Sequence, residues 1–401
     1  MNVLQVNSVC GAGSTGRIAV NLYKVIKEQG HGCKIAYGRG NAPADIDTIK
    51  IGTNIDNCLH LINTRAFDRH GLGSVNATRT FIKQIENYNP QIVHLHNLHG
   101  YYLNIKLLFE YLISVKKPIV WTLHDCWGFT GHCTNFDYIG CKKWKTGCFQ
   151  CPQKKEYPAS LLFDNSETNY LIKKNLLSSV EKMVIVTPSQ WLADLVKQSF
   201  LNILPVKIIN NGIDLTKFKP AESNFRKTYN LQDKFIVLGA ANQWSENKGL
   251  NIFVELSKKL GNNIKIVMVG LNEKQKKRLP PQIIGIARTN NEKELAEIYT
   301  AADVFVNPTL QDNFPTTNLE ALACGTPVIT YNTGGSGESI DDTCGIAVEK
   351  GNIRELIQAI HFIKANNFDS ENCISRAKLY NSDDIFKKYI DIYKEMLYKP
   401  Q

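Results

Sequence analysis

The fold of this 401-residue chain is decided by one segment, which reads Asp312-Asn313-Phe314-Pro315-Thr316-Thr317-Asn318-Leu319-Glu320-Ala321-Leu322-Ala323-Cys324-Gly325-Thr326-Pro327. Pro315 suits the first turn of a helix, because the N–H that proline lacks would have no intrahelical partner there. Gly325 ends that helix, and the apolar residues that follow read as a buried strand. The segment therefore predicts a short helix that leads into a parallel strand.

Two carboxylates, Asp312 and Glu320, stand eight positions apart in this segment. Thr316 and Glu320 are four residues apart, so they share one face of the predicted helix. A helix N-terminus at the carboxyl edge of a parallel sheet presents free amides to an anion. This face predicts a site that meets a phosphate with amides and hydroxyl groups with a carboxylate. A buried helix with a capping acid is the alternative.

Strand and helix patterns alternate along the chain, which predicts two doubly wound parallel sheets. The expected strands are residues 2–9, 33–37, 91–96, 119–124, 184–188, 235–240, 264–269, 282–286, 304–307 and 328–330. The expected helices are residues 18–29, 190–198, 250–260, 292–300, 316–323, 353–365 and 382–398. The two halves are expected to join within residues 204–218.

Composition is that of an ordinary globular protein, with 43% apolar and 21% charged residues. The chain has no run of 18 apolar residues and no signal-type start, so a cytoplasmic protein is expected. Residues 1–200 carry 22 Lys and Arg against 14 Asp and Glu, a net charge of +8. Such a basic half suits the inner face of an anionic membrane or a pyrophosphate-bearing acceptor, and a solvated surface without a partner is the alternative. Nucleic acid is not expected, because no basic stripe with interleaved aromatic residues occurs.

A glycine-rich loop, Gly11-Ala12-Gly13-Ser14-Thr15-Gly16, follows the first strand and matches G-x-G-x-x-G. Gly13 and Gly16 allow the backbone to approach a phosphate closely, and Arg17 comes next in the chain. An NAD enzyme needs an acid at the end of the second strand, where this chain has Arg39, which suits a 2′-phosphate. An NADP-dependent oxidoreductase is therefore one alternative.

Cysteines crowd the stretch 126–151. The last four of this cluster have the spacing C-x7-C-x6-C-x2-C, namely Cys133, Cys141, Cys148 and Cys151. Four thiolates around one Zn²⁺ would stabilise a loop that shows little secondary-structure periodicity. A structural zinc is therefore our hypothesis. Free buried thiols and occasional disulfides are the alternatives.

Taken in order, these motifs resemble the retaining glycosyltransferases of family 4, and within them the surface-polysaccharide group of colanic acid and capsule type. The opening segment resembles the Glu-x7-Glu signature of that family, with Asp312 in place of the first Glu. Three further segments resemble family motifs: Thr122-Leu123-His124-Asp125, Asn211-Gly212-Ile213-Asp214 and the loop 239–249 that holds Lys248. The family has an Arg five or six positions before this Lys, where the chain has Gln243 and Asn242.

The resemblance implies a GT-B fold, in which two Rossmann-like domains face each other across a cleft. Residues 1–205 would form the acceptor-side domain with the Cys-rich loop 126–151, and residues 206–380 the nucleotide-sugar donor domain. Residues 381–401 would form a helix that crosses back to pack on the N-terminal domain.

The resemblance also implies transfer of a hexosyl unit from a nucleotide diphosphate sugar to a saccharide or lipid-linked saccharide, with retained configuration and no catalytic cofactor. Its catalytic residues would be His124, Asp312 and Glu320. Its donor-binding residues would be Gly13, Gly16, Arg17, Lys248, Phe314, Pro315, Thr316 and Thr317. A non-catalytic protein that keeps the fold as a binding module is the second alternative.

Overall fold

The computed structural model describes residues 1–366 and 368–398, and these form two compact units. One unit comprises residues 1–210 together with the chain from Ile385 onward, and the other comprises Asn211–Asp384. Residues 367 and 399–401, which fall within the expected donor domain and the expected C-terminal segment, lie outside the described residues. None of the described helices is long and apolar enough to cross a membrane.

The first unit is built on a parallel sheet with the strand order β3-β2-β1-β4-β5-β6-β7. Its strands are β1 (Asn2–Val9), β2 (Gly32–Arg39), β3 (Thr48–Lys50), β4 (Ile92–Leu95), β5 (Ile119–Thr122), β6 (Met183–Thr187) and β7 (Val206–Ile208). Its helices are α1 (Gly13–Glu28), α2 (Asn54–Phe67), α3 (Val75–Tyr88), α4 (Ile105–Ser114), α5 (Ser166–Leu177) and α6 (Gln190–Lys197), and its 3-10 turns are η1 (Trp127–Phe129), η2 (Lys143–Lys145) and η3 (Phe200–Ile203).

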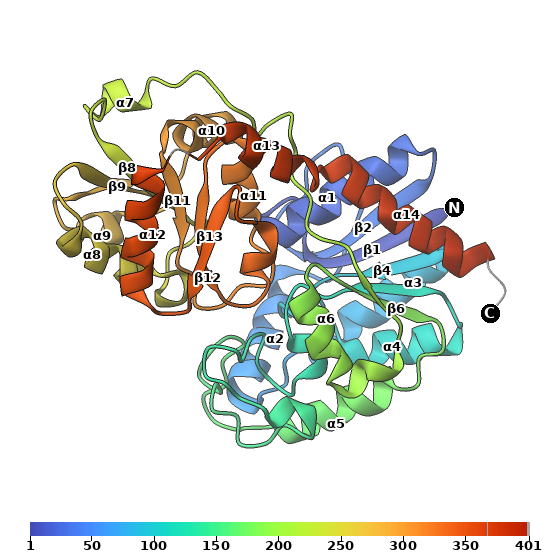
Figure 1. The fold of residues 1–401 in the computed structure, drawn as a ribbon. Helices are drawn as coiled ribbons and strands as arrows, with labels where there is room; N and C mark the ends of the chain where they lie inside the picture. The colour runs from blue at the N-terminus through green and yellow to red at the C-terminus, as the bar shows by residue number, and fades with distance from the viewer. Residues whose placement is uncertain (367, 399–401) are drawn as a thin grey trace. The chain divides into compact units, whose positions relative to one another are not determined.

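Successive strand residues of this sheet alternate between two apolar cores. Leu4 and Val6 belong to the core under α3, α4 and α5, whereas Val3 belongs to the core under α1 and α14 (Ser382–Tyr398). Helices therefore cover both faces of the sheet (Figure 1), as a buried parallel sheet requires.

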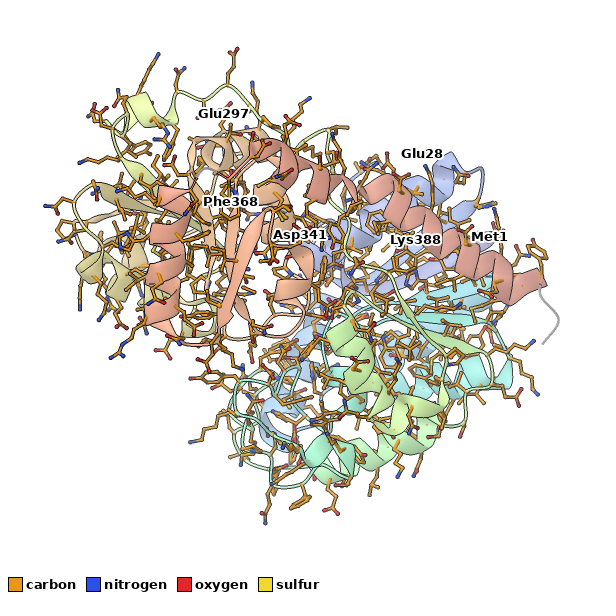
Figure 2. All side chains as sticks on the ribbon, viewed as in Figure 1. Met1, Glu28, Glu297, Asp341, Phe368 and Lys388 are labelled. Carbon is orange, nitrogen blue, oxygen red and sulfur yellow. The ribbon has the colours of Figure 1, made fainter. Side chains whose placement is uncertain are left out.

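The C-terminal helix α14 returns to the first unit. Its buried face includes Phe386, Tyr389 and Tyr393, and Lys388 is exposed on the opposite side (Figure 2). The hydroxyl group of Tyr393 hydrogen-bonds the Nδ1 atom of His94 on β4. The helix thus has one apolar face that packs on the core and one polar face that meets solvent.

The second unit is built on a parallel sheet with the strand order β10-β9-β8-β11-β12-β13. Its strands are β8 (Phe235–Ala240), β9 (Ile264–Val269), β10 (Ile283–Ile286), β11 (Val304–Asn307), β12 (Val328–Asn332) and β13 (Gly345–Glu349). Its helices are α7 (Phe225–Thr228), α8 (Leu250–Lys259), α9 (Glu273–Lys276), α10 (Glu292–Ala301), α11 (Thr316–Ala323), α12 (Ile353–Ala365) and α13 (Ser370–Lys378), and its 3-10 turns are η4 (Glu246–Lys248) and η5 (Ser336–Ser339).

The expected fold class, two doubly wound α/β domains, is confirmed. Strands β3, β7 and β13 and several helices of the described chain were not predicted, and two of the predicted features differ in detail. Helix α1 begins at Gly13 rather than at residue 18, so the last four residues of the glycine-rich loop form the first helical turn. Pro315 is the residue before α11 rather than part of its first turn, and its ψ of 120° is extended.

Candidate active site

The strand order of the second unit places two loops side by side. The chain adds β9 and β10 on one side of β8, and β11, β12 and β13 on the other. The chain therefore adds strands outward in opposite directions from β8 and β11. Because β8 and β11 are neighbours, the loops that follow them both begin at the same carboxyl edge of the sheet. Parallel α/β sheets bind ligands at such a switch point.

These two loops carry Lys248 and Asp312, two of the residues predicted from the sequence. The Lys248 Nζ atom lies 2.6 Å from Oδ2 of Asp312, and the other carboxylate oxygen accepts the backbone N–H of Asn313 at 2.9 Å. The side chains keep 39% and 20% of their surface exposed, so the pair is open to a ligand. The structure thus brings together a cation and a carboxylate that are 64 residues apart in the chain.

Backbone contacts hold this arrangement. The N–H of Leu310 donates to the carbonyl of Asn247 at 2.8 Å, which ties the loop after β11 to the loop after β8. Gly334 has a φ of +57°, and a Cβ atom there would lie 1.7 Å from the carbonyl oxygen of Asp312. The loop after β12 can therefore support Asp312 only with glycine at this position.

Helix α11 begins beside the pair, with Thr316 and Thr317 half-buried and no side-chain cap at its N-terminus. One turn later, Glu320 is only 6% exposed, and its Oε2 accepts the hydroxyl of the fully buried Tyr299 at 3.0 Å. The first turn of α11 therefore faces the switch point. The side chain of Glu320 is held in place by Tyr299 of α10.

Phe314 is placed differently from the other predicted donor residues. Its side chain is 2% exposed, packs 5.5 Å from the ring of Tyr380, and belongs to the core. Its carbonyl accepts the side-chain amide of Asn211 at 2.8 Å. The side chain of Phe314 thus fixes the turn before α11 from inside the core, and Pro315 next to it is also buried.

Asn318 is a polar residue of this region that we did not predict from the sequence. It is fully buried, accepts the side-chain amide of Asn307 at 2.8 Å, and donates to the hydroxyl of Ser339 at 3.0 Å. These bonds lock α11 to the end of β11 and to η5. Residue spacing alone does not mark Asn318 as buried, but a buried Asn side chain must be hydrogen-bonded, as it is here.

The first unit has its own switch point, between β1 and β4. The glycine-rich loop follows β1, where the N–H of Gly11 donates to the carbonyl of Gly16 at 3.1 Å. Gly16 is buried and closely packed, whereas Gly13, at a φ of +63°, faces open space and Arg17 is exposed. The predicted phosphate-facing positions therefore include exposed Gly13 and Arg17, while Gly16 serves packing.

His124 follows β5 and ends a buried chain of hydrogen bonds. Its Nε2 lies 3.1 Å from Nδ1 of His96, whose Nε2 lies 3.0 Å from the side-chain oxygen of Gln5. Burial lowers the pKa of His124 to about 4, against the opposing effect of the Asp125 charge. The imidazole is therefore neutral near pH 7 and acts there as a hydrogen-bonding group.

Asp125, the next residue, pairs with a second histidine, His99. Its Oδ2 lies 2.7 Å from Nε2 of His99, and its Oδ1 accepts the N–H of Trp127 at 2.9 Å. Burial alone would raise the pKa of Asp125, but His99 and these hydrogen bonds lower it on balance. Asp125 thus anchors the loop after β4 to the loop after β5.

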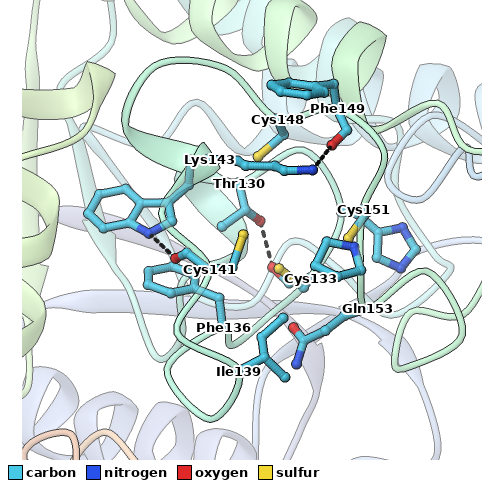
Figure 3. A pocket seen from close by; sticks show the side chains of 13 residues that line it. Thr130, Cys133, Phe136, Ile139, Cys141, Lys143, Cys148, Phe149, Cys151 and Gln153 are labelled. Atoms are coloured by element: carbon cyan, nitrogen blue, oxygen red, sulfur yellow. Dashed lines mark hydrogen bonds between the residues drawn. The ribbon is translucent and has the colours of Figure 1, made fainter.

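The four cysteines of the zinc hypothesis line one small cavity (Figure 3). The space inside measures about 10 Å³, close to the room that one water-sized sphere needs. Cys148 accepts the backbone N–H of Gly131 at 3.2 Å, and a hydrogen bond from Cys133 lowers the pKa of Cys151 to about 7. The thiols are thus gathered, although no three His, Cys, Asp or Glu side chains within residues 1–366 and 368–398 stand where they could hold a metal ion.

The chain belongs to a family of glycosyltransferases. Residues 15–217 match the family described as Glycosyltransferase Family 4, and residues 221–380 match Glycosyl transferases group 1. The matches cover both units, so the glycosyltransferase assignment does not depend on a single motif. Neither the oxidoreductase nor the non-catalytic alternative receives support from them.

Named relatives agree with this class. The chain is 26% identical to the "Putative colanic acid biosynthesis glycosyl transferase WcaC" of Escherichia coli (strain K12), over 99% of this chain and 100% of the relative. It is 27% identical to an Escherichia coli "UDP-Gal:alpha-D-GlcNAc-diphosphoundecaprenol alpha-1,3-galactosyltransferase", over 50% of this chain and 57% of that enzyme.

Solved structures share the fold over the whole chain. Sucrose-phosphate synthase from Thermosynechococcus elongatus superposes with a TM-score of 0.72 at 16% identity, covering 99% of both chains. Anabaena HepE in complex with UDP superposes with a TM-score of 0.68 at 15% identity, covering 98% of this chain and 100% of HepE. The fold is therefore GT-B, as the sequence resemblance implied.

Proposed function

We propose that this glycosyltransferase moves a hexosyl unit from a nucleotide diphosphate sugar to a saccharide or lipid-linked saccharide, with retention of configuration. The observation that carries the proposal is the Lys248–Asp312 ion pair beside the N-terminus of α11. A cation, free helix amides and a carboxylate at one switch point match the three parts of such a donor, which are the diphosphate, the ribose and the sugar.

The charged residues and the start of α11 then have the following proposed roles. Lys248 and the amides at Thr316 and Thr317 neutralise the diphosphate, whose charge grows as it leaves. Glu320 binds the ribose hydroxyl groups, and Asp312 binds hydroxyl groups of the sugar. Arg17 is the second cation of the proposal, because the family's Arg before Lys248 is absent here.

His124 contacts the transferred sugar as a neutral hydrogen-bonding group in this proposal, which its lowered pKa supports. We assign the acceptor proton to the leaving phosphate on the same face of the sugar. The bond from the anomeric carbon to the phosphate breaks as the bond to the acceptor oxygen forms, which retains the configuration. This route needs no side-chain nucleophile and no catalytic metal.

The acceptor is proposed from the relatives. One is named for colanic acid biosynthesis and another for a diphosphoundecaprenol acceptor. We therefore propose an acceptor of surface-polysaccharide assembly at the inner face of the cell membrane. The net charge of +8 in residues 1–200 supports a partner that carries negative charge.

We also propose that Cys133, Cys141, Cys148 and Cys151 hold a structural Zn²⁺. Four thiols on one cavity supply the donor set that zinc prefers, and Cys148 is fixed there by the N–H of Gly131. To bind the ion, the four thiol groups would have to move closer together around the cavity. The ion would stabilise the loop 126–151 and would take no part in sugar transfer.

A panel of nucleotide diphosphate sugars in a thermal-shift assay tests the donor. A donor that binds the folded protein raises its melting temperature, and the rise increases with the donor concentration relative to its Kd. We expect stabilisation by one nucleotide diphosphate and its sugar, and none by NADPH. Release of that nucleotide with an acceptor, and an NMR assignment of the product anomer, test transfer and retention. Stabilisation by NADPH alone would contradict the proposal.

A further inference from the structure

Helix α2 is turned the opposite way from an ordinary surface helix. Its buried residues are His60 and Thr64, whereas Ile55, Leu59 and Ile62 are 72%, 61% and 57% exposed. The three apolar residues recur at a spacing of four and three, so they form one stripe along the helix. A stripe of this kind normally faces the core.

Hydrogen bonds show that this orientation is built in. The Nε2 atom of His60 accepts the N–H groups of Gly71 and Gly73 at 3.1 and 3.2 Å, and its Nδ1 lies 2.9 Å from the hydroxyl of Ser74. The hydroxyl of Thr64 donates to the carbonyl of His60 at 2.9 Å. The polar face of α2 is therefore fixed to the protein, and the apolar face is held outward.

A neighbouring loop continues the apolar surface. Leu161, Leu162 and Phe163 are 65%, 67% and 54% exposed, and the N–H of Leu161 donates to the carbonyl of Arg65 at 2.7 Å. The ring of Phe163 stacks on that of Phe67 with centroids 5.6 Å apart. We call these side chains the docking face, which consists of Ile55, Leu59, Ile62, Phe67, Leu161, Leu162 and Phe163.

We propose that the docking face inserts into the surface of a lipid bilayer that contains anionic lipids. A contiguous set of large exposed side chains marks an interaction site, and a membrane-surface helix has an apolar stripe of this kind. Basic groups lie beside it. The Nζ atom of Lys154 is 3.3 Å from the carbonyl of Leu162, and Arg69 is exposed just after α2.

The position of the docking face suits an acceptor that resides in the membrane. His70, just after α2, accepts the N–H of Gly100 at 3.0 Å, and Gly100 lies in the loop after β4 at the switch point of the first unit. The docking face thus belongs to the carboxyl end of that sheet. The choice of a membrane over a second copy of the chain rests on the lipid-linked acceptor of the proposed function.

Co-sedimentation with vesicles tests the proposal. The probe is the full chain with vesicles of phosphatidylethanolamine and about one third phosphatidylglycerol. We expect the wild type to pellet with the vesicles and Leu59→Asp/Leu162→Asp to bind about tenfold more weakly or worse. The matched control is Ile203→Asp, at a 61% exposed residue of η3, which should bind as the wild type does.

Both substituted positions are solvent-exposed, so an unchanged melting temperature confirms folding. A wild type that stays in the supernatant overturns the proposal. So does a double variant that binds vesicles normally while it dissociates a dimer in sedimentation velocity, because the face would then bind a second copy. Transfer to a water-soluble saccharide acceptor tests the proposed function separately from the docking inference. A wild type that transfers to this acceptor but does not bind vesicles defeats only the docking inference, whereas a wild type that binds vesicles but transfers to no acceptor defeats the proposed function.

Discussion

Lys248 and Asp312 form an ion pair across the switch point of the second unit, with Nζ 2.6 Å from Oδ2. Each residue comes from the loop after a different strand, and both loops are tied together by the hydrogen bond from Leu310 to Asn247. The pair is partly exposed, so its net contribution to stability is small. Its significance is that one ligand can meet both charges at once.

Lys248→Ala is expected to weaken binding of the nucleoside diphosphate. Removing a charge-assisted hydrogen bond costs about 1.5–3 kcal/mol, roughly a ten- to hundredfold rise in Kd. Isothermal titration with the diphosphate measures this change. The control is Lys258→Ala, which removes an exposed lysine of α8 and should leave the Kd unchanged. Equal affinities for both variants and the wild type would remove Lys248 from the donor site.

Glu320→Ala is expected to abolish transfer, and Tyr299→Phe to impair it less. Tyr299 is a positioning residue, since its hydroxyl bonds Glu320 at 3.0 Å. We expect the KM for the donor to rise in Tyr299→Phe and stability to fall by about 1 kcal/mol. The control is Tyr331→Phe, because the buried Tyr331 hydroxyl has no partner in the described part of the chain. An unchanged turnover and KM in Glu320→Ala would falsify the assigned role of that carboxylate.

The donor-side elements were predictable because their signals are local. The segment from Asp312 to Pro327 contains its own helix start, stop and following strand, and α11 has the expected bounds Thr316–Ala323. Alternating apolar strands and helices likewise predicted the central strands of both sheets, but not β3, β7 and β13 of the described chain. The contact of Glu320 with Tyr299 and the core position of Phe314 depend on tertiary packing, for which residue spacing holds no information.

Helix α2 shows where apolar periodicity misleads. Its stripe of Ile55, Leu59 and Ile62 would be assigned to a core, yet the buried side is His60 and Thr64. The reason is that hydrogen bonds from glycine amides satisfy His60 inside the protein. Among the described helices, α2, α3, α4, α5, α7, α9 and α13 were not predicted from the sequence.

His124→Ala is expected to lower kcat about a hundredfold, the range found when a hydrogen-bonding group at a reacting centre is removed. The pH dependence is a second readout. With a pKa of about 4, His124 is protonated in only about 3% of molecules at pH 5.5, so it should not reduce kcat between pH 8 and 5.5. An activity loss near pH 6.5 that disappears in His124→Asn would contradict a neutral role.

Metal analysis decides the zinc proposal. Protein purified without a histidine tag should contain about one Zn²⁺ per chain, and Cys148→Ser/Cys151→Ser should contain little. The control is Cys58→Ser, at an exposed thiol of α2. A chelator should lower the melting temperature of the wild type and not that of the double variant, because zinc binding is coupled to folding.

The zinc proposal fails if reduced protein, with zinc supplied during expression, contains no metal. It also fails if the double variant retains the wild-type metal content. Co²⁺ reconstitution adds an independent readout, since thiolate ligands to Co²⁺ give a visible absorption spectrum that should depend on Cys148 and Cys151.

His94→Gln is expected to reduce the dependence of stability on pH. His94 links β4 to α14 through Tyr393, and burial lowers its pKa from 6.5 to about 3. In the unfolded chain the imidazole gains a proton below pH 6.5, whereas in the folded chain it stays neutral. The contribution of His94 to the free energy of unfolding is therefore complete above pH 6.5. This contribution is lost as the pH falls towards 3, by up to about 1.4 kcal/mol per pH unit.

Urea unfolding between pH 7 and 4 measures this difference. The His94→Gln variant should be less stable at pH 7, because it loses the bond to Tyr393, and its stability should decline less steeply as the pH falls. The control is His361→Gln, at an exposed position of α12, which should keep the wild-type slope. Parallel slopes for His94→Gln and the wild type would mean that His94 takes up its proton in the folded protein, and that the link to α14 does not require the neutral imidazole.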